Sequence, residues 1–293
     1  MISALQTFFK DIKLSHSVFA MPFALSIFTF LNIQSSDLFN PLFLILIIIC
    51  IVSARTFAMG MNRYLDWKID AENIRTKLRS IPAGKISKNS VLIISLVSGL
   101  IFIAASFVLK PLCGYLSFFI LLILGFYPAM KKISYFTHYY LGFCLALAPL
   151  GVAVASSENF NFPASVYFIC AGVMLWTGGF DILYALQDIA FDRAKNLHSI
   201  PARFGVNAAI NISRISFAGM ITCLIASGIL AHKNSYYFIG VGVVAIILTL
   251  EHLLIRDAKN NHGHSKNINL AFFNLNAFCS VFFLVFCVMD LYL

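Results

Sequence analysis

Apolar runs long enough to cross a lipid bilayer dominate this sequence and restrict what it can fold into. Of its 293 residues, 60% are hydrophobic and only 11% are charged. A transmembrane helix needs about 20 predominantly apolar residues. By this measure nine spans are predicted, centred on residues 16–34, 40–65, 91–109, 113–130, 137–156, 163–189, 207–231, 235–255 and 268–291. The chain is therefore predicted to be an all-α, polytopic membrane protein.

The distribution of basic residues predicts the orientation of these spans. The N-terminus and the segments after the second, fourth, sixth and eighth spans together hold 16 of the 21 lysines and arginines. Because positively charged loops stay on the cytoplasmic side, the N-terminus is predicted to be cytoplasmic and the C-terminus to lie across the membrane. The net charge of +9 is thus interpreted as a topology signal, and no nucleic-acid partner is expected.

Two clusters of acidic residues lie at the predicted cytoplasmic ends of the second and sixth spans. Their five aspartates, together with Glu72, make up half of the chain's 12 acidic residues. Carboxylates in or beside a bilayer are costly, so such a concentration indicates a function. The clusters consist of Asn62, Asp66 and Asp70, and of Asp181, Asp188 and Asp192.

Helical spacing is expected to gather the side chains of each cluster. Asn62, Asp66 and Asp70 follow one another at intervals of four residues, which places them on one helix face. Asp188 and Asp192 have the same spacing. Asp181 is expected two turns deeper on that face, about 10 Å further into the membrane at 1.5 Å of rise per residue. Tyr184 would fall between Asp181 and Asp188.

The residue types of the clusters predict Mg²⁺ bound against a diphosphate. Converging carboxylates repel one another unless cations intervene, and oxygen ligands from Asp and Asn suit Mg²⁺, which phosphate oxygens usually complete. Arginine and lysine clamp such a group and stabilise its departure. The basic residues near the clusters are Lys68, Arg75, Lys77, Arg79, Lys131, Lys132, Arg193 and Arg203.

Polar loops follow both clusters, at about residues 67–90 and 193–206, and are predicted to cap the site on the cytoplasmic side. Each loop contains the sequence Ser-Ile-Pro-Ala, at 80–83 and at 199–202. Equivalent clusters and loops four spans apart indicate a faint internal duplication of a four-helix unit. The whole chain, residues 1–293, is nevertheless expected to form a single domain.

Two long motifs resemble the Asp-rich motifs of the UbiA family of intramembrane prenyltransferases. They are M-N-R-Y-L-D-W-K-I-D-A-E-N-I-R-T-K-L-R-S-I-P-A-G-K-I-S (61–87) and D-I-L-Y-A-L-Q-D-I-A-F-D-R-A-K-N-L-H-S-I-P-A-R-F-G (181–205). H-S-V-F-A-M-P-F-A-L (16–25) and Y-P-A-M-K-K (127–132) are further matches. The resemblance covers essentially the whole chain. It implies nine helices around a central cavity, in the inner membrane, with the active site facing the cytoplasm.

The resemblance also implies roles for the site residues. Asn62, Asp66 and Asp70 would bind one Mg²⁺-diphosphate arm, and Asp188 with Asp192 the other. Ionisation of the donor would give an allylic cation that an electron-rich aromatic ring attacks. The implied contacts to substrate come from Lys131, from Arg75 or Arg79, and from Tyr184 and Arg203. The expected partners are a polyprenyl diphosphate, an aromatic acid and the lipid bilayer, with no obligate protein partner.

Arg55 and Asp181 leave alternatives open. Arg55 lies deep in the second span, where an arginine needs an anionic partner. That partner is either Asp181, in a structural salt bridge, or the carboxylate of an aromatic substrate. Asp181 could instead orient or deprotonate a phenol as a catalytic residue.

The acceptor is not determined by these motifs. The chain is most similar to the 4-hydroxybenzoate polyprenyltransferase branch, which serves ubiquinone synthesis. A related branch is proposed to act on 1,4-dihydroxy-6-naphthoate for menaquinone, and both acceptors are hydroxylated aromatic carboxylates. An ion-coupled transporter is a remote alternative, because intramembrane carboxylates also serve as cation sites.

Overall fold

The computed structural model describes residues 2–13, 19–31, 40–157, 161–259, 268 and 271–293, and within these ranges it contains helices and no strand. Eight of the described helices are long and apolar enough to cross a membrane. The prediction of an all-α, polytopic membrane protein is confirmed. The first predicted span is described only as a shorter apolar helix, Ala20–Thr29, so the count of nine and the orientation stay predictions.

The chain forms two compact units, which are described separately. The first unit comprises Met1–Ser17 and Phe39–Ala129, and the second comprises Val18–Leu38 and Met130–Leu293.

The first unit is built around one long helix. Its helices are α1 (Ile2–Asp11), α4 (Pro41–Glu72), α5 (Lys88–Leu109) and α6 (Pro111–Met130). Asn40 caps α4 by accepting hydrogen bonds from the backbone of Leu42 and Phe43. With 32 residues, α4 is about 48 Å long and exceeds the apolar core of a bilayer by several turns. Those last turns carry Asn62, Asp66 and Asp70.

Packing fixes α4 and α1 against the rest of the first unit. α4 packs along α5, and α1 contacts the start of α5. The contact between α1 and α5 is made by a buried apolar cluster of Phe8, Ile12, Ile86 and Val91. Because α1 is held in this way, Asp11 at its end has a defined position relative to α4.

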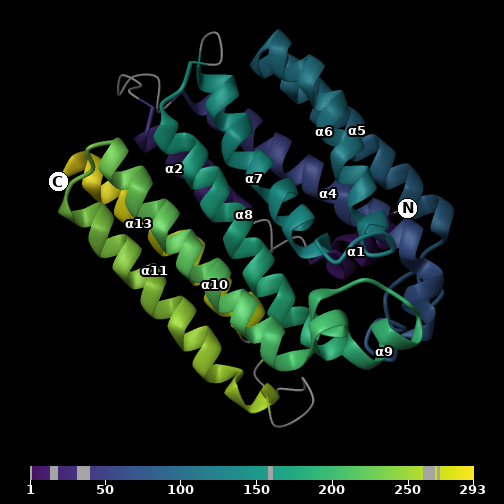
Figure 1. Cartoon of the computed structure of the whole chain (residues 1–293). Coiled ribbons are helices and arrows are strands. Elements are labelled where there is room, and N and C mark those ends of the chain that lie inside the picture. The colour runs from purple at the N-terminus through teal and green to yellow at the C-terminus, as the bar shows by residue number, and fades with distance from the viewer. Residues whose placement is uncertain (1, 14–18, 32–39, 158–160, 260–267, 269–270) are drawn as a thin grey trace. The chain divides into compact units, whose positions relative to one another are not determined.

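The second unit is a bundle with α8 at its centre (Figure 1). α8 packs against α7 and α10, α11 packs against α10 and α13, and α2 packs against α7 and α13. The elements are α2 (Ala20–Ser26), η2 (Ile27–Thr29), α7 (Thr137–Ser156), α8 (Ala164–Ala185), η3 (Leu186–Asp188), α9 (Ile189–Ala194), α10 (Ile200–Leu230), α11 (Ser235–Leu254), η4 (Arg256–Lys259), η5 (Ala271–Leu275) and α13 (Asn276–Tyr292).

Glycines allow the close packing of α8. A Cβ atom on Gly142 of α7 would lie 2.3 Å from the backbone oxygen of Met174, and one on Gly179 would lie 2.5 Å from the ring of Phe217 in α10. Small residues at such crossings are typical of helices that pack within membranes. α8 is therefore held on two sides and gives Asp181 a rigid support.

The segment that carries the second acidic cluster is interrupted, which the helical spacing did not predict. α8 ends at Ala185, a 3₁₀ turn follows at Leu186–Asp188, and the short helix α9 carries Asp192. The prediction of a continuous α-helix through Asp181, Asp188 and Asp192 is wrong, while their position on one face stays a prediction. Because a 3₁₀ turn rises about 2.0 Å per residue, the interruption does not shorten the expected depth difference between Asp181 and Asp188, which stays a prediction.

α10 begins earlier than predicted and contains a kink. Ser199 caps the helix by accepting a hydrogen bond from the backbone of Ala202, and a proline stands in the first turn. Gly205 then adopts φ 82° and ψ 173°, a conformation open essentially only to glycine. The part of the chain predicted as a loop over 193–206 thus consists of the end of α9, a short connection and about the first two turns of α10.

Candidate active site

The first acidic cluster lies at the C-terminal end of α4. The backbone carbonyls there carry partial negative charge, which disfavours nearby carboxylates. Asp70 is 5% exposed and Asp66 lies one turn before it. Cations are therefore needed to balance the charge at this end of the helix.

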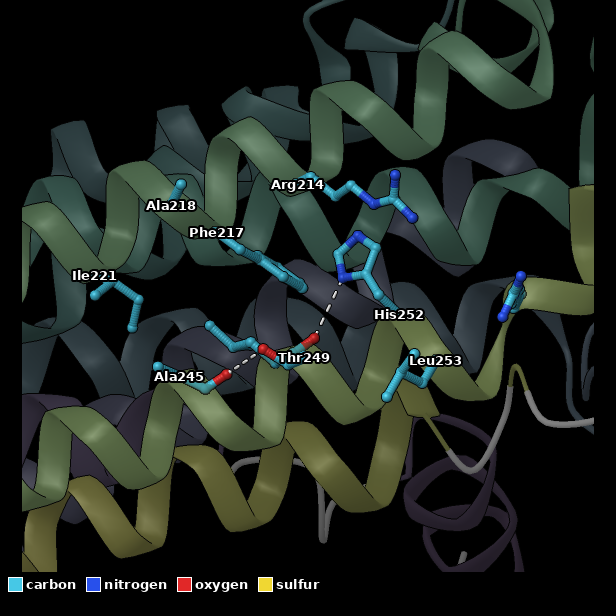
Figure 2. A pocket seen from close by; sticks show the side chains of 10 residues that line it. Arg214, Phe217, Ala218, Ile221, Ala245, Thr249, His252 and Leu253 are labelled. Carbon is cyan, nitrogen blue, oxygen red and sulfur yellow. Dashed lines mark hydrogen bonds between the residues drawn. The ribbon is translucent and has the colours of Figure 1, made fainter.

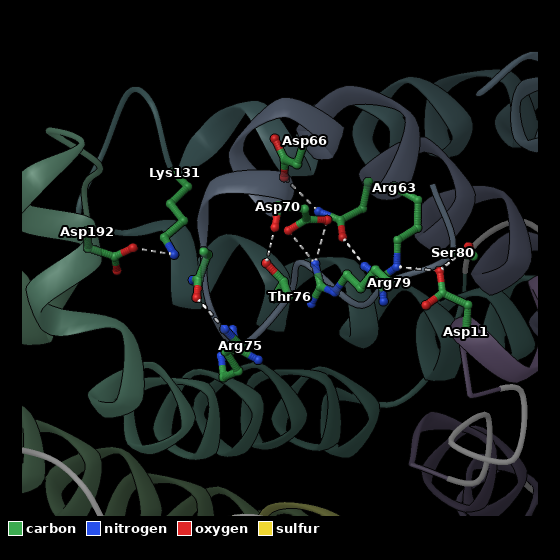
Figure 3. Close-up of polar contacts among 12 residues, drawn as sticks. Asp11, Arg63, Asp66, Asp70, Arg75, Thr76, Arg79, Ser80, Lys131 and Asp192 are labelled. Atoms are coloured by element: carbon green, nitrogen blue, oxygen red, sulfur yellow. Dashed lines mark hydrogen bonds and ion pairs between the residues drawn. The ribbon is translucent and has the colours of Figure 1, made fainter. Parts of the chain in front are cut away.

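Arg79 supplies one such cation. Its Nη1 atom lies 2.7 Å from Oδ1 and 2.8 Å from Oδ2 of Asp70 (Figure 3). The loop after α4 brings Arg79 back to the helix through a series of turns. In these turns Asn73 Oδ1 accepts from the backbone of Arg75, and Thr76 donates to the backbone oxygen of Asp70. The predicted substrate-binding residue Arg79 is thus held on the predicted metal ligand Asp70.

A second network links α1 to the same cluster. Arg63 is 6% exposed, and its Nε lies 3.2 Å from Asp11 Oδ2 (Figure 3). Its Nη1 donates to Asn62 Oδ1 over 2.8 Å, and Asn62 in turn donates to Asp66 Oδ2 over 3.0 Å. Ser80 donates to Asp11 over 2.7 Å. The network orients Asp66 and ties the first Ser-Ile-Pro-Ala sequence to α1.

Positive charge gathers around the first cluster. Partial desolvation lowers the pKa of Lys13, and so do the positive charges of Arg63, Arg79 and Arg75. Arg75 itself is exposed. Side chains that repel one another in this way are stabilised when an anion binds among them, so this end of the first unit suits an anionic ligand.

The second acidic cluster is organised around Asp192, whose side chain is fully buried. Lys131 Nζ lies 2.8 Å from Asp192 Oδ1 (Figure 3). Ser199 Oγ donates to Asp192 Oδ2 over 2.8 Å. The backbone oxygen of Lys131 accepts from the backbone of His198 over 2.7 Å. A buried carboxylate is stable only with such partners. Asp188 is also buried, at 5% exposure.

The aromatic ring of Tyr135 supports the connection between α9 and α10. His198 lies edge-on to this ring with centroids 4.6 Å apart, and the guanidinium of Arg203 lies 5.5 Å from its centroid. Arg193 donates from Nε to the backbone oxygen of Ala202. Arg203 is exposed at this surface. Tyr184 contacts a different ring, that of Phe273, at 6.0 Å.

Asp181 has a partner that the sequence did not suggest. His138 Nδ1 lies 2.7 Å from Asp181 Oδ2, and His138 Nε2 accepts from the backbone of Ile200 over 3.3 Å. Because Nε2 accepts, Nδ1 carries the proton and donates to the carboxylate, which leaves the imidazole neutral. His138 is 2% exposed. It thus connects α7, α8 and the start of α10 at the predicted catalytic aspartate.

Arg55 has a partner within the first unit. Its Nη2 donates to the backbone oxygen of Ile12 over 3.1 Å. Its Nη1 is buried and has no hydrogen-bond partner among the residues that the structure describes. The two side chains suggested as a salt bridge therefore each have a partner in their own unit, Ile12 for Arg55 and His138 for Asp181. A buried donor without a partner is costly, which favours a ligand for Arg55.

Asp11 and His138 are the polar partners that sequence reasoning missed. Both lie far along the chain from the motifs that they contact. The one signal that pointed in this direction is the repeated Ser-Ile-Pro-Ala, because the serine of each copy donates to an aspartate, Ser80 to Asp11 and Ser199 to Asp192.

The donor set is compatible with Mg²⁺ completed by substrate. Across the described ranges, no group of three or more His, Cys, Asp or Glu side chains lies close enough to hold a metal ion. Mg²⁺ does not need such a cage, since it is usually held by one or two carboxylates, waters and phosphate oxygens. The two clusters offer carboxylate and amide oxygens and no nitrogen or sulfur ligand, which is the donor chemistry that Mg²⁺ prefers.

Comparison with known proteins identifies the family. The model of the UbiA prenyltransferase family matches residues 20–277. The chain belongs to this family. The prediction of an intramembrane prenyltransferase is confirmed, and the transporter alternative is set aside.

Relatives and solved structures of the UbiA family agree with this. A 4-hydroxybenzoate octaprenyltransferase from Shewanella piezotolerans is 28% identical over 205 residues, which are 70% of this chain and 69% of the relative. One from Pseudomonas fluorescens is 28% identical over 214 residues, 71% and 69% of the two chains. The apo structure of a UbiA homolog from Aeropyrum pernix K1 has a TM-score of 0.81 at 25% identity and covers 94% of this chain and 98% of its own.

A further UbiA homolog shares the fold. That protein, from Archaeoglobus fulgidus, was solved with GPP and Mg²⁺ bound, and it has a TM-score of 0.67 at 14% identity over 98% of this chain and its own full length.

Proposed function

We propose that this protein transfers a polyprenyl group from polyprenyl diphosphate to a hydroxylated aromatic carboxylate of the 4-hydroxybenzoate type, with Mg²⁺, in respiratory quinone biosynthesis. The names of the curated relatives support this acceptor. The observation that carries the proposal is the pairing of a buried carboxylate with a basic side chain in each unit. The pairs are Asp70 with Arg79 and Asp192 with Lys131.

Each pair has the chemistry needed to receive a metal-bound diphosphate. The residues that would hold Mg²⁺ are Asn62, Asp66, Asp70, Asp188 and Asp192. The chemistry that bound Mg²⁺ supplies is neutralisation of the leaving group's negative charge. With the carboxylates as metal ligands, Arg79 and Lys131 would be free to donate to phosphate oxygens. We infer that both pairs act on one diphosphate because the two motifs resemble the paired Asp-rich motifs of the UbiA family.

The transfer needs residues that help the leaving group depart. The C–O bond of the donor breaks, and the diphosphate keeps the electron pair. The allylic cation left behind is attacked by a ring carbon of the acceptor, and the ring proton is then lost to restore aromaticity. Arg79 and Lys131 stabilise the charge that develops on the diphosphate, and the exposed Arg75 and Arg203 are further candidates for this role.

Two further residues suit the acceptor. Asp181 presents a carboxylate fixed by His138, which can accept a hydrogen bond from the phenol or take its proton. Arg55 has a buried guanidinium nitrogen that suits the acceptor's carboxylate. Tyr184 lies one turn from Asp181 and is a candidate for the wall of the prenyl site.

The location of the activity follows the predicted topology. We place the active site at the cytoplasmic face of the inner membrane, with the whole chain acting as one catalytic domain. The segments 67–90 and 193–206 serve as its caps. No protein partner is part of this proposal.

The experiment that tests the proposal is prenyl transfer in membranes containing the overexpressed protein. 4-Hydroxybenzoate and 1,4-dihydroxy-6-naphthoate are offered in parallel with Mg²⁺ and a polyprenyl diphosphate, and products are detected by mass spectrometry. We expect a prenylated 4-hydroxybenzoate that disappears when EDTA is added. Product from the naphthoate alone would assign the enzyme to menaquinone synthesis instead. No product from either acceptor would overturn the acceptor class.

A further inference from the structure

A pocket lies between α10 and α11 of the second unit, and none of its lining residues belongs to the site described above. It has a volume of about 590 Å³. Its lining residues are Arg214, Phe217, Ala218, Ile221, Ala245, Leu248, Thr249, His252, Leu253 and Arg256 (Figure 2). These residues include three basic side chains and no carboxylate.

The pocket is cationic at one end and apolar at the other. Arg214, Phe217 and Ile221 follow one another at helical spacing on α10, and Ala245, Leu248 and His252 do so on α11. The two helices are consecutive and antiparallel, so Arg214 lies level with His252 (Figure 2). Ile221 is about 10 Å further along α10, at 1.5 Å of rise per residue. The polar and apolar ends are therefore separated by about the depth of a lipid headgroup region.

The polar end can receive an anion. Arg214 and Arg256 are exposed. His252 Nδ1 donates to the backbone oxygen of Leu248 over 3.2 Å, so Nε2 of the neutral imidazole is an acceptor and the anion is left to the two arginines. Thr249 uses its hydroxyl on the backbone oxygen of Ala245 and adds no free polar group. The remaining floor is apolar, with Phe217 5% and Leu248 3% exposed.

We infer that this pocket binds an anionic phospholipid of the leaflet that the predicted topology makes cytoplasmic. The phosphate lies between Arg214 and Arg256, and the start of an acyl chain lies along Phe217 and Ile221. Charge complementarity selects this occupant, because basic pockets between membrane helices on the cytoplasmic side attract anionic headgroups. A neutral phospholipid would gain the apolar contacts only. The inference does not depend on which acceptor the enzyme prenylates.

The test compares two lipids that differ in headgroup charge. The full-length protein is purified in a neutral detergent, and phosphatidylglycerol or phosphatidylcholine with the same acyl chains is added. Native mass spectrometry then counts bound lipid at each concentration. We expect the wild-type protein to bind phosphatidylglycerol about 30-fold more tightly, since each of the two arginines near the headgroup contributes about fivefold. Equal binding of the two lipids would overturn the inference.

Variants locate the site. Arg214→Gln/Arg256→Gln should remove most of the preference for phosphatidylglycerol. Lys85→Gln/Lys195→Gln, which removes two other exposed cations from predicted cytoplasmic loops, should keep it. Retention of the preference by the arginine double variant would place the anionic lipid elsewhere and contradict the inference.

A further variant distinguishes binding of the whole lipid from binding of its phosphate group alone. Ala218→Trp keeps both arginines but fills the apolar part of the pocket. It should weaken binding of phosphatidylglycerol, and excess glycerol phosphate should not displace the lipid from the wild-type protein. Unchanged binding by Ala218→Trp, or displacement by glycerol phosphate, would mean that only the anion is recognised and would overturn the proposal of a lipid site. Melting temperatures of all variants report whether folding is retained.

Discussion

Arg79 and Asp70 illustrate how a single residue pair can prepare a site for an anion. Arg79 donates to both carboxylate oxygens of Asp70 at the negative end of α4. We expect Arg79→Gln to lower prenyl transfer about 100-fold, the typical loss for one donor to a developing negative charge. The matched control is Lys77→Gln, an exposed cation in the same loop. It should stay close to wild-type activity. Wild-type turnover by Arg79→Gln would contradict the role.

His138 is a positioning residue for Asp181 in this account. His138→Ala should lower kcat and leave the KM for polyprenyl diphosphate unchanged, because the imidazole contacts Asp181 and not the diphosphate arm. His138→Asn keeps a donor near the position of Nδ1 and should recover part of kcat. Both variants lose the acceptor for the backbone of Ile200, which costs about 1–3 kcal/mol. An altered KM for the diphosphate with unchanged kcat would argue against this assignment.

Sequence reasoning at this scale identified the aspartates but not their partners. Motif spacing relates residues on one helix, so it linked Asn62 to Asp66, which do form a hydrogen bond. It carries no information about contacts between segments far apart in the chain. Those contacts, such as Asp11 with Arg63 or His138 with Asp181, depend on how α1 and α7 pack.

At the scale of elements, Gly205 tests the kink in α10. Its φ of 82° is strained for any residue with a Cβ, although no atom lies close enough to clash. Gly205→Ala should therefore lower stability by about 1–3 kcal/mol. Gly242→Ala is the control, because that glycine lies in α11 with open space around it. It should be neutral or slightly stabilising. The melting temperatures of the purified variants compare the two, and equal values would contradict the strained backbone.

The N-terminal cap of α10 offers a second comparison. Ser199 caps α10 and also donates to the buried Asp192, whereas Ser87 caps α5 at an exposed position. Ser87→Ala should cost about 1 kcal/mol of stability. Ser199→Ala should cost more, because it also leaves a buried carboxylate with one donor fewer. Equal losses in melting temperature would show that the contact between Ser199 and Asp192 contributes little.

Hydrophobic runs predicted the long helices well but not their local interruptions. The predicted span 137–156 coincides with α7. Its apolar run is bounded by polar and aromatic residues at the start and by a serine at the end. The 3₁₀ turn at Leu186–Asp188 and the early start of α10 left no trace in hydropathy. Such features depend on capping and backbone geometry, which an average over about 20 residues does not resolve.

At the scale of the whole molecule, the predicted topology depends on the distribution of basic residues alone. Reporter fusions after Leu293 and at the N-terminus would measure it. We expect a reporter that is active only outside the cytoplasm to be active at the C-terminus and inactive at the N-terminus. Activity on the same side at both ends would require an even number of spans and would refute nine.

The central claim is that both acidic clusters are needed for one Mg²⁺-dependent transfer. The most direct measurement is product formation by Asp66→Asn and Asp188→Asn, one change in each cluster, across a titration of Mg²⁺ after EDTA treatment. Glu72→Gln, an exposed acid beside the first cluster, is the matched control. The account predicts that Mg²⁺ restores the wild-type and control proteins while both aspartate variants remain folded and inactive. Full turnover by either aspartate variant, or by the wild-type protein in EDTA, would contradict it.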